Sequence, residues 1–191
     1  MAEPAAGAGE VRHEIRLSGS GGQGIILAAT LLADAAVATG REVIATQSYG
    51  PEARGGASKA EVIVADGEID FPEVTAPSVT VCLSQEAFDA FAALTVPGGL
   101  VVCDDRLVQA VPLADRRVVG LPFTQLAESE LGKAIAANIV MLGARQELTG
   151  VVGAEALEEA VRRRLPAKIV ELNVRALNLG HERAARALSR P

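Results

Sequence analysis

The chain has 191 residues, a net charge of −6 and 49% hydrophobic but only 3% aromatic residues. This length fits one domain with a substantial core, built from Val, Leu, Ile and Ala, as in a buried parallel sheet flanked by helices. The acidic balance and the lack of a basic face argue against a nucleic-acid binder, which needs clustered cations.

The N-terminal segment is small and acidic and lacks the basic-then-apolar pattern of an export signal. We therefore expect residues 1–12 to be a disordered lead-in, residues 13–191 to form a single domain, and the protein to be cytoplasmic. The longest apolar stretch, residues 25–38, contains Asp34 and is too short to span a bilayer, so we expect no membrane segment.

The hydrophobic pattern alternates between strand and helix signals along the chain. Strands are predicted over residues 13–17, 42–46, 59–65, 79–83, 100–103 and 117–121. Helices are predicted over residues 23–39, 84–94, 124–148 (with Gly132 as a weak point), 154–165 and 167–188. This order predicts a three-layer α/β/α fold with a mostly parallel, Rossmann-like sheet and a helical C-terminal segment.

A glycine-rich loop follows the first predicted strand. Gly19, Gly21 and Gly24 fit the pattern G-x-G-x-x-G between a strand and a helix. The helix N-terminus could hold a phosphate with its free N–H groups, and Gln23 is the side chain best placed to donate there. The second strand ends in Thr-Gln-Ser without an acid or an arginine, which argues against NAD and NADP. A different phosphate or polar ligand, or a tight turn without a ligand, remain as alternatives.

A second glycine-rich segment, Ser48 to Gly56, follows the second predicted strand. Its Arg54 could bind an anionic group or a partner backbone with two parallel hydrogen bonds; a solvated surface turn is the alternative. Loops at the carboxyl ends of adjacent parallel strands share one crevice. We therefore expect the two glycine-rich segments to face each other.

Cys82 and Cys103 lie inside apolar, strand-like runs. Two cysteines are too few for an iron–sulfur cluster and lack a zinc spacing. We expect two buried, reduced thiols, with a disulfide between neighbouring strands as the alternative.

The remaining polar candidates have structural explanations. Asp104 and Asp105 are expected to cap a turn at a strand end, and Asn138, if buried, needs a hydrogen-bond partner from the glycine-rich loop or a partner subunit. His13 and His181 lie at the two edges of the domain and are expected to be solvated or structural. We expect no catalytic residue and no metal site.

The two glycine-rich motifs together resemble those of the gamma subunit of the 2-oxoacid:ferredoxin oxidoreductases. The motifs are Ser-Gly-Ser-Gly-Gly-Gln-Gly and Ser-Tyr-Gly-Pro-Glu-Ala-Arg-Gly-Gly-Ala-Ser. The resemblance covers about residues 14–175. The segments that carry it are 18–24, 48–58, 70–72, 83–88 and 138–144.

The resemblance implies a multi-subunit enzyme that decarboxylates a 2-oxoacid on thiamine diphosphate and passes electrons through iron–sulfur clusters to ferredoxin, with coenzyme A as acyl acceptor. Thiamine diphosphate, Mg²⁺ and [4Fe-4S] clusters are then expected on alpha, beta and, where present, delta subunits. The motif is most similar to that of 2-oxoglutarate enzymes, with a branched-chain 2-oxoacid, an aryl glyoxylate or indolepyruvate as alternative substrates.

The resemblance also implies a site that contacts coenzyme A or a partner subunit. Its expected residues are Gly19, Gly21, Gly22, Gln23, Gly24, Tyr49, Glu52 and Arg54. The rival interpretation is a stand-alone, Rossmann-like nucleotide-binding or regulatory module, which would bind a nucleotide tightly by itself.

Overall fold

The computed structural model describes residues 11–48 and 57–189, and shows a six-stranded sheet in the order β2-β3-β1-β4-β5-β6. β1, β4, β5 and β6 are parallel, whereas β3 runs antiparallel to both of its neighbours. The strands are β1 (Arg12–Gly19), β2 (Glu42–Ser48), β3 (Ser58–Ala65), β4 (Val79–Cys82), β5 (Leu100–Asp104) and β6 (Arg117–Leu121). The mostly parallel sheet predicted from the sequence is confirmed.

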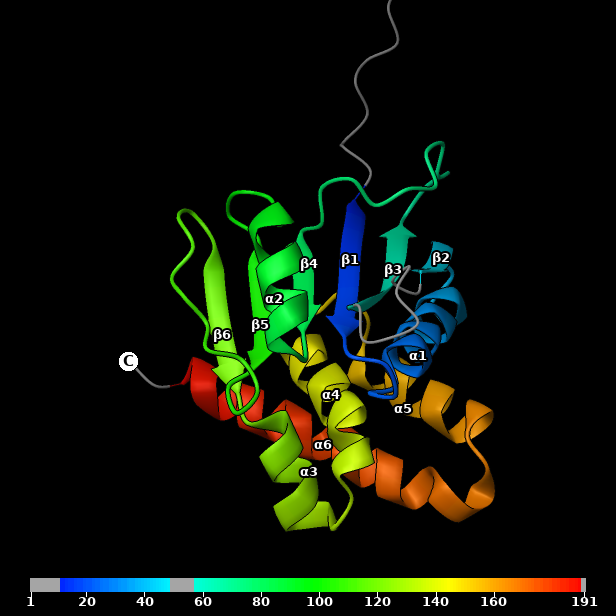
Figure 1. The fold of residues 1–191 in the computed structure, drawn as a ribbon. Helices are drawn as coiled ribbons and strands as arrows, with labels where there is room; N and C mark the ends of the chain where they lie inside the picture. Colours follow the sequence, from blue (N-terminus) through cyan, green and yellow to red (C-terminus); the bar gives the residue numbers. More distant parts are fainter. Residues whose placement is uncertain (1–10, 49–56, 190–191) are drawn as a thin grey trace, which may run out of the picture.

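The helices form two layers of unequal size. They are α1 (Ile25–Ala38), α2 (Gln85–Phe91), α3 (Phe123–Leu131), α4 (Ala137–Thr149), α5 (Ala154–Arg164) and α6 (Ala167–Leu188), with the 3-10 turns η1 (Ala92–Leu94) and η2 (Ala134–Ala136). The larger core cluster joins one sheet face to α1, α3, α4, α5 and α6, and a smaller cluster packs α2 and η1 on the opposite face. Figure 1 shows α2 over β4 and β5.

Strand β1 is buried on both faces, as expected for a sheet between two layers. Ile15 and Leu17 enter the larger cluster, while Arg16 and Ser18 alternate with them on the opposite face. Arg16 is only 4% exposed and is paired with Glu61 of β3 at 2.6 Å, which offsets the cost of burying its charge. One face of the sheet is therefore apolar, whereas the other combines the smaller core cluster with an ion pair between β1 and β3.

One feature of the topology differs from the prediction. β1 and β2 are not neighbours, because β3 lies between them and pairs with β1 along its whole length, from Arg12 opposite Ala65 to Gly19 opposite Ser58. β3 contains a continuous buried run, 62–65, suited to an interior position, whereas β2 ends in exposed polar residues suited to an edge. The buried apolar residues of β3 thus explain its interior position, which the order of the strands in the chain does not.

Several predicted boundaries are confirmed, with two corrections. Ser84 caps α2 by accepting a hydrogen bond from the Ala87 N–H at 3.2 Å. The helix predicted over 124–148 is interrupted, because Gly132 adopts a left-handed conformation (φ 67°) and η2 follows before α4 begins. Arg12, placed in the lead-in by the sequence, belongs to β1; residues 1–10 lie outside the described part of the chain.

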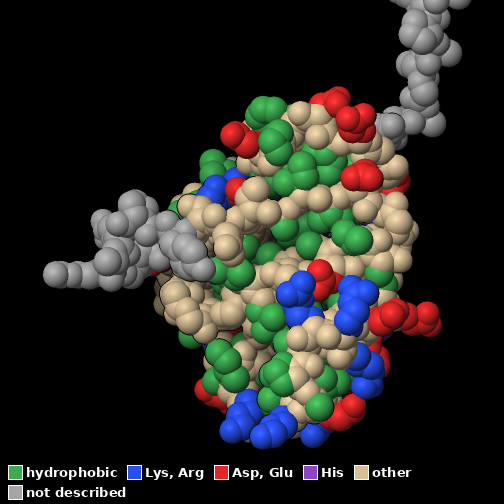
Figure 2. Space-filling view, turned by 90° about the vertical axis from the view of Figure 1, so that its right-hand side faces the viewer, with side chains coloured by type: hydrophobic (Ala, Val, Ile, Leu, Met, Phe, Trp, Pro, Cys, Tyr) green, Lys and Arg blue, Asp and Glu red, His purple; other side chains and the backbone are tan. Residues whose placement is uncertain are grey.

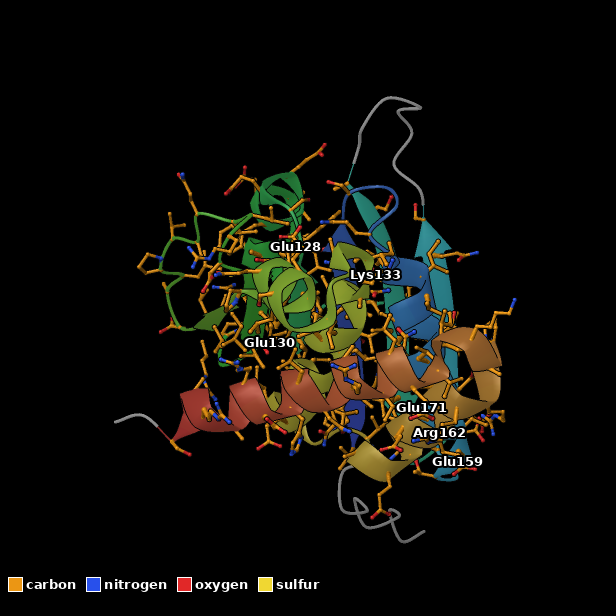
Figure 3. All side chains as sticks on the ribbon, turned by 90° about the horizontal axis from the view of Figure 1, so that it is seen from below. Glu128, Glu130, Lys133, Glu159, Arg162 and Glu171 are labelled. Atoms are coloured by element: carbon orange, nitrogen blue, oxygen red, sulfur yellow. The ribbon has the colours of Figure 1, made fainter. Side chains whose placement is uncertain are left out.

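Helix α6 crosses the whole width of the molecule (Figure 3). It packs closely on α4, where a Cβ on Gly143 would collide with the Leu177 carbonyl and one on Gly180 with the Val140 carbonyl. At the surface, Arg162 of α5 pairs with Glu171 of α6 at 2.8 Å. Within residues 11–48 and 57–189, no helix is both long and apolar enough to cross a membrane.

Candidate functional site

The candidate site lies at the carboxyl edge of the sheet, between β1 and β4. From β1 the chain continues through α1 toward β2 at one edge of the sheet. From β4 it continues through α2 toward β5, in the direction of the other edge, so the two connections diverge between β1 and β4. Such a divergence leaves a crevice in which α/β proteins bind ligands. A hollow of about 230 Å³ lies at this point, lined by Gly22, Gln23, Leu83, Leu107, Thr124, Ala134, Ile135 and Ala137.

Gln23 holds the glycine-rich loop against the end of β4. Its Oε1 accepts a hydrogen bond from the Ser20 N–H at 2.7 Å, and its Nε2 donates to the Leu83 carbonyl at 2.9 Å. A Cβ on Gly19 would collide with this Oε1. The sequence suggested Gln23 as a donor to a ligand; in the structure its amide is engaged within the chain, so its visible role is to shape the loop.

Gly24 and Asn138 form a second fastening of the same loop. Gly24 precedes α1 in a left-handed conformation (φ 73°), and its carbonyl accepts a hydrogen bond from Asn138 Nδ2 at 3.0 Å. A Cβ on Gly24 would collide with that nitrogen. The buried Asn138 thus obtains its partner from the glycine-rich loop, one of the two sources predicted. Gly21 and Gly22, in contrast, face open space.

The electrostatics of the loop come mainly from the α1 N-terminus. No side chain caps α1, so its first N–H groups can bind an anion. A second hollow of about 290 Å³ lies beside this end, lined by Ser20, Gly21, Gly22, Gly24, Ile25, Ile26 and Ser58. Neither hollow has a lysine or arginine among its described lining residues. The visible site is therefore apolar, with one uncapped helix end.

Asp104 is a structural carboxylate beside the first hollow. It is fully buried and accepts hydrogen bonds from the Thr124 N–H (2.8 Å), the Thr124 hydroxyl (2.6 Å) and the Arg106 N–H (3.0 Å). These bonds fasten the start of α3 to the end of β5. The predicted role of this carboxylate as the cap of a turn is confirmed. Partial burial raises the pKa of the neighbouring Asp105.

The two cysteines lie opposite each other on β4 and β5 and are free, as the first of the two alternatives predicted. Both are packed with α2 in the smaller core cluster. Burial raises the pKa of Cys82 to about 12 and that of Cys103 to about 11. Because the thiolate is the reactive form, these thiols are poor nucleophiles at neutral pH.

Neither histidine lines the two hollows. His181 Nδ1 lies 3.0 Å from Gln146 Oε1 and 3.0 Å from Glu147 Oε2, so it joins α6 to α4. Burial, reinforced by the nearby positive charge of Arg41, lowers the pKa of His13 in β1. His181 thus makes a structural contact between two helices, one of the two roles predicted for it.

The second glycine-rich segment carries three of the predicted site residues. Tyr49, Glu52 and Arg54 lie outside the described residues, but the two ends of the segment are placed. Ser48 ends β2 and Ser58 begins β3, where it is paired with Gly19 and lines the second hollow. The segment therefore starts and ends at the same sheet edge as the glycine-rich loop.

The hydrophobic rim of the first hollow was not predicted. Leu107 and Ile135 are 43% and 64% exposed there. The helix predicted over residues 124–148 includes Ile135, but in the structure Ile135 belongs to η2, which precedes α4. The signal that could have revealed this is Gly132, since a left-handed glycine ends a helix and releases the next residues from its face.

Known proteins match both the sequence and the fold. The family model of pyruvate ferredoxin/flavodoxin oxidoreductases matches residues 14–183. A 2-oxoglutarate synthase subunit KorC of Methanocaldococcus jannaschii is 47% identical over 176 residues, which cover 91% of this chain and 94% of that protein. A pyruvate synthase subunit PorC of Methanothermobacter thermautotrophicus is 32% identical over 173 residues, which cover 88% and 94%.

Among solved structures, the gamma subunit of a keto/oxoacid ferredoxin oxidoreductase from Geobacter sulfurreducens has a TM-score of 0.85 and 44% identity. The match covers 93% of this chain and 98% of that one. Sequence and fold agree over nearly the whole described domain. The chain therefore belongs to the pyruvate ferredoxin/flavodoxin oxidoreductase family, as its two glycine-rich motifs predicted.

Proposed function

We propose that this chain is the gamma subunit of a multi-subunit 2-oxoglutarate:ferredoxin oxidoreductase, which decarboxylates its 2-oxoacid oxidatively and forms acyl-CoA. The observation that carries the proposal is the near full-length identity of 47% to a 2-oxoglutarate synthase subunit. The pyruvate synthase subunit, aligned over a similar share of both chains, is only 32% identical. This difference favours 2-oxoglutarate over pyruvate as the substrate of the complex.

The chemistry is assigned to partner subunits. A [4Fe-4S] cluster takes about four thiolates, and this chain has two cysteines, which face each other inside the smaller core cluster. We place the [4Fe-4S] clusters, thiamine diphosphate and Mg²⁺ on the alpha, beta and, where present, delta subunits, with ferredoxin as the acceptor. Free thiols suit a reducing compartment, so we place the complex in the cytoplasm.

The glycine-rich loop is proposed to contact coenzyme A or a partner subunit. Gly21 and Gly22 expose their backbone, and the adjacent α1 N-terminus is uncapped, a combination that can hold a phosphate. Arg54 would supply the cation that the described lining lacks, and Tyr49 and Glu52 would reach toward the catalytic subunit. Gly19, Gln23 and Gly24 would keep the loop in shape.

The assignment is tested on the native complex. The chain is tagged in its own host, purified without oxygen and weighed as an intact assembly. The sample is then assayed for coenzyme A-dependent reduction of a viologen dye with 2-oxoglutarate, pyruvate, a branched-chain 2-oxoacid, an aryl glyoxylate and indolepyruvate. We expect larger subunits with thiamine diphosphate and iron, and the highest kcat/KM with 2-oxoglutarate. A lone chain with a bound nucleotide would instead identify a regulatory module.

Replacing Arg54 tests the proposed site within the same complex. Loss of a charge-assisted contact costs about 1.5–3 kcal/mol, so Arg54→Ala should raise the KM for coenzyme A, or weaken subunit affinity, about tenfold or more. Arg163→Ala, at an exposed position of α5, is the matched control. If Arg54→Ala leaves both the coenzyme A KM and the subunit affinity at wild-type values, Arg54 has no role at this site.

A further inference from the structure

Arg145 of α4 is a buried cation without a partner of opposite charge. It is 0% exposed, and its Nε, Nη1 and Nη2 find no hydrogen-bond acceptor among residues 11–48 and 57–189. Most described lysines and arginines are instead partly or largely exposed to water, like the blue side chains in Figure 2. Arg16, the other buried arginine of the described chain, pairs with Glu61 at 2.6 Å. Arg145 therefore differs from it in that the whole guanidinium is unpaired.

This side chain carries its charge at neutral pH. Burial lowers the pKa of Arg145 only to about 10, so the guanidinium keeps its proton at pH 7. A charge inside a protein is strongly destabilising unless a group of opposite charge offsets it. A water molecule would accept a hydrogen bond there but would leave the positive charge uncompensated. The burial of Arg145 therefore indicates a negatively charged partner.

Arg145 lies in the half of α4 that is far from the glycine-rich loop. α4 starts at the carboxyl edge of the sheet, where Asn138 contacts Gly24, and Arg145 belongs to its last two turns. There it is close to His13, near the start of β1. Burial lowers the pKa of His13, and the positive charges of Arg41 and Arg145 lower it further. The surroundings of Arg145 are therefore separate from the candidate functional site.

The charges of the described groups at this edge do not balance. Asp66 is the carboxylate that acts on His13, and it pairs with Arg41 at 3.1 Å. His13 itself is neutral at pH 7, because its pKa is lowered from an ordinary value of 6.5. Two permanent positive charges, Arg41 and Arg145, therefore stand against one negative charge. The guanidinium of Arg145 accounts for the surplus.

We propose that one small inorganic anion, chloride in ordinary buffers, binds the guanidinium of Arg145 inside the domain. A single negative charge neutralises the surplus, and the guanidinium offers it a planar set of N–H donors. The anion has to be small because the guanidinium is completely enclosed. This enclosure excludes phosphate esters and the carboxylates of a partner protein. The anion stabilises the packing of α4 beside β1, the strand that leads into the glycine-rich loop.

Thermal unfolding of the full chain tests this anion site. Samples dialysed free of chloride are compared in sodium chloride and in sodium gluconate at equal ionic strength, because gluconate is too large for an enclosed site. A ligand that binds only the folded chain raises its Tm. With chloride at about 100 times its dissociation constant, the Tm of the wild type should rise by about 5–10 °C relative to gluconate.

Two variants assign the chloride effect to Arg145. Arg145→Met replaces the charge with an apolar side chain and should unfold at the same Tm in both salts. The matched control is Arg163→Met, at an exposed position of α5, which should retain the full chloride effect. Circular dichroism checks the fold of each variant. Equal Tm values of the wild type in both salts, or a chloride effect that persists in Arg145→Met, would overturn the proposal.

Anomalous diffraction adds a measurement that needs no variant. Wild-type crystals grown with bromide in place of chloride should show an anomalous peak within hydrogen-bond distance of the Arg145 guanidinium. Bromide peaks at the surface alone would count against the site. So would a wild type that does not respond to chloride but whose Tm falls in Glu10→Gln, because the counter-charge of Arg145 would then be Glu10.

Discussion

At the scale of single residues, the glycines of the first loop serve two different purposes. A side chain at Gly19 would displace the Gln23 amide, and a side chain at Gly24 would displace the Asn138 amide, because these amides occupy the space of a Cβ. Gly21 and Gly22 face open space, and Gly22 has a positive φ of 85°. The motif therefore has two glycines that pack against neighbouring side chains, Gly19 and Gly24, and two whose backbone is accessible, Gly21 and Gly22.

This division predicts opposite outcomes for the same substitution. Gly24→Ala should lower the free energy of unfolding by at least about 1–2 kcal/mol, because a left-handed conformation is strained for alanine and because Asn138 would have to move. Gly21→Ala has space for its methyl group and should unfold like the wild type. Denaturant titration followed by circular dichroism measures both. Equal stability of the two variants would contradict the packing described here.

The buried thiols predict a loss of stability at alkaline pH. Burial raises the pKa of Cys82 to about 12 and that of Cys103 to about 11, above the ordinary value of 9.0. As the pH rises above about 9, the unfolded chain loses these protons first, so the free energy of unfolding should fall until the folded thiols titrate as well.

Denaturant titrations between pH 7 and pH 11 measure this dependence. A variant with alanine at both cysteines should show a weaker decline with pH than the wild type. The native chain should also react slowly with a thiol reagent at pH 8, and the unfolded chain should expose both groups. Fast reaction of the native chain would show that β4 and β5 do not enclose them.

At the scale of elements, the contact between α4 and α6 depends on two glycines. Gly143 lies against the Leu177 carbonyl and Gly180 against the Val140 carbonyl, so each helix presents bare backbone to the other. His181 adds a polar contact to Gln146 and Glu147 beside them. This close approach lets α6 support α4, which in turn carries the Asn138 that fastens the glycine-rich loop.

Gly180→Ala should therefore cost about 1–3 kcal/mol of unfolding free energy, the usual range for overpacking a tight contact. Gly153→Ala is the matched control, because Gly153 has open space around it and a negative φ of −68°. Chemical denaturation of both variants measures the difference. If Gly180→Ala had the same free energy of unfolding as Gly153→Ala, α4 and α6 would be able to move apart without a loss of stability.

At the scale of the whole molecule, the hydrophobic rim at the carboxyl edge is the feature that needs a partner. Leu107 and Ile135 border a mostly uncharged hollow and are largely exposed in the single chain. Exposed apolar groups around a hollow commonly mark a contact with another protein. The rim lies beside the glycine-rich loop, which agrees with a subunit contact at this edge.

Ile135→Asp should weaken assembly with the larger subunits at least tenfold without lowering the stability of the isolated chain. The side chain is 64% exposed, so the charge stays hydrated in the free chain but would be buried in a contact. Val111→Asp, at a 58% exposed position outside this hollow, provides the comparison. Pull-down with the partner subunits measures assembly, and an undiminished yield with Ile135→Asp would remove the rim from the interface.

Local structure was largely predictable from the sequence. The last strand, Arg117–Leu121, and the last helix, Ala167–Leu188, have the predicted bounds. Ser84 caps α2 as predicted, because a serine cap depends only on the three residues after it. The two glycine-rich motifs were also enough to indicate the family, and Asn138 was correctly linked to the first of them.

Only the tertiary structure decided the strand order, the role of Gln23 and the exposed rim at Ile135. Strand and helix signals depend on neighbouring residues, so the amino-acid sequence by itself determined the elements and the motif that defines the family. β3 lies between β2 and β1 because it pairs with a strand that is distant in the sequence. The hydrogen bond from Gln23 to Leu83 likewise joins residues that are far apart in the chain. The stability of such contacts depends on how the whole chain packs, so no local sequence pattern reveals them.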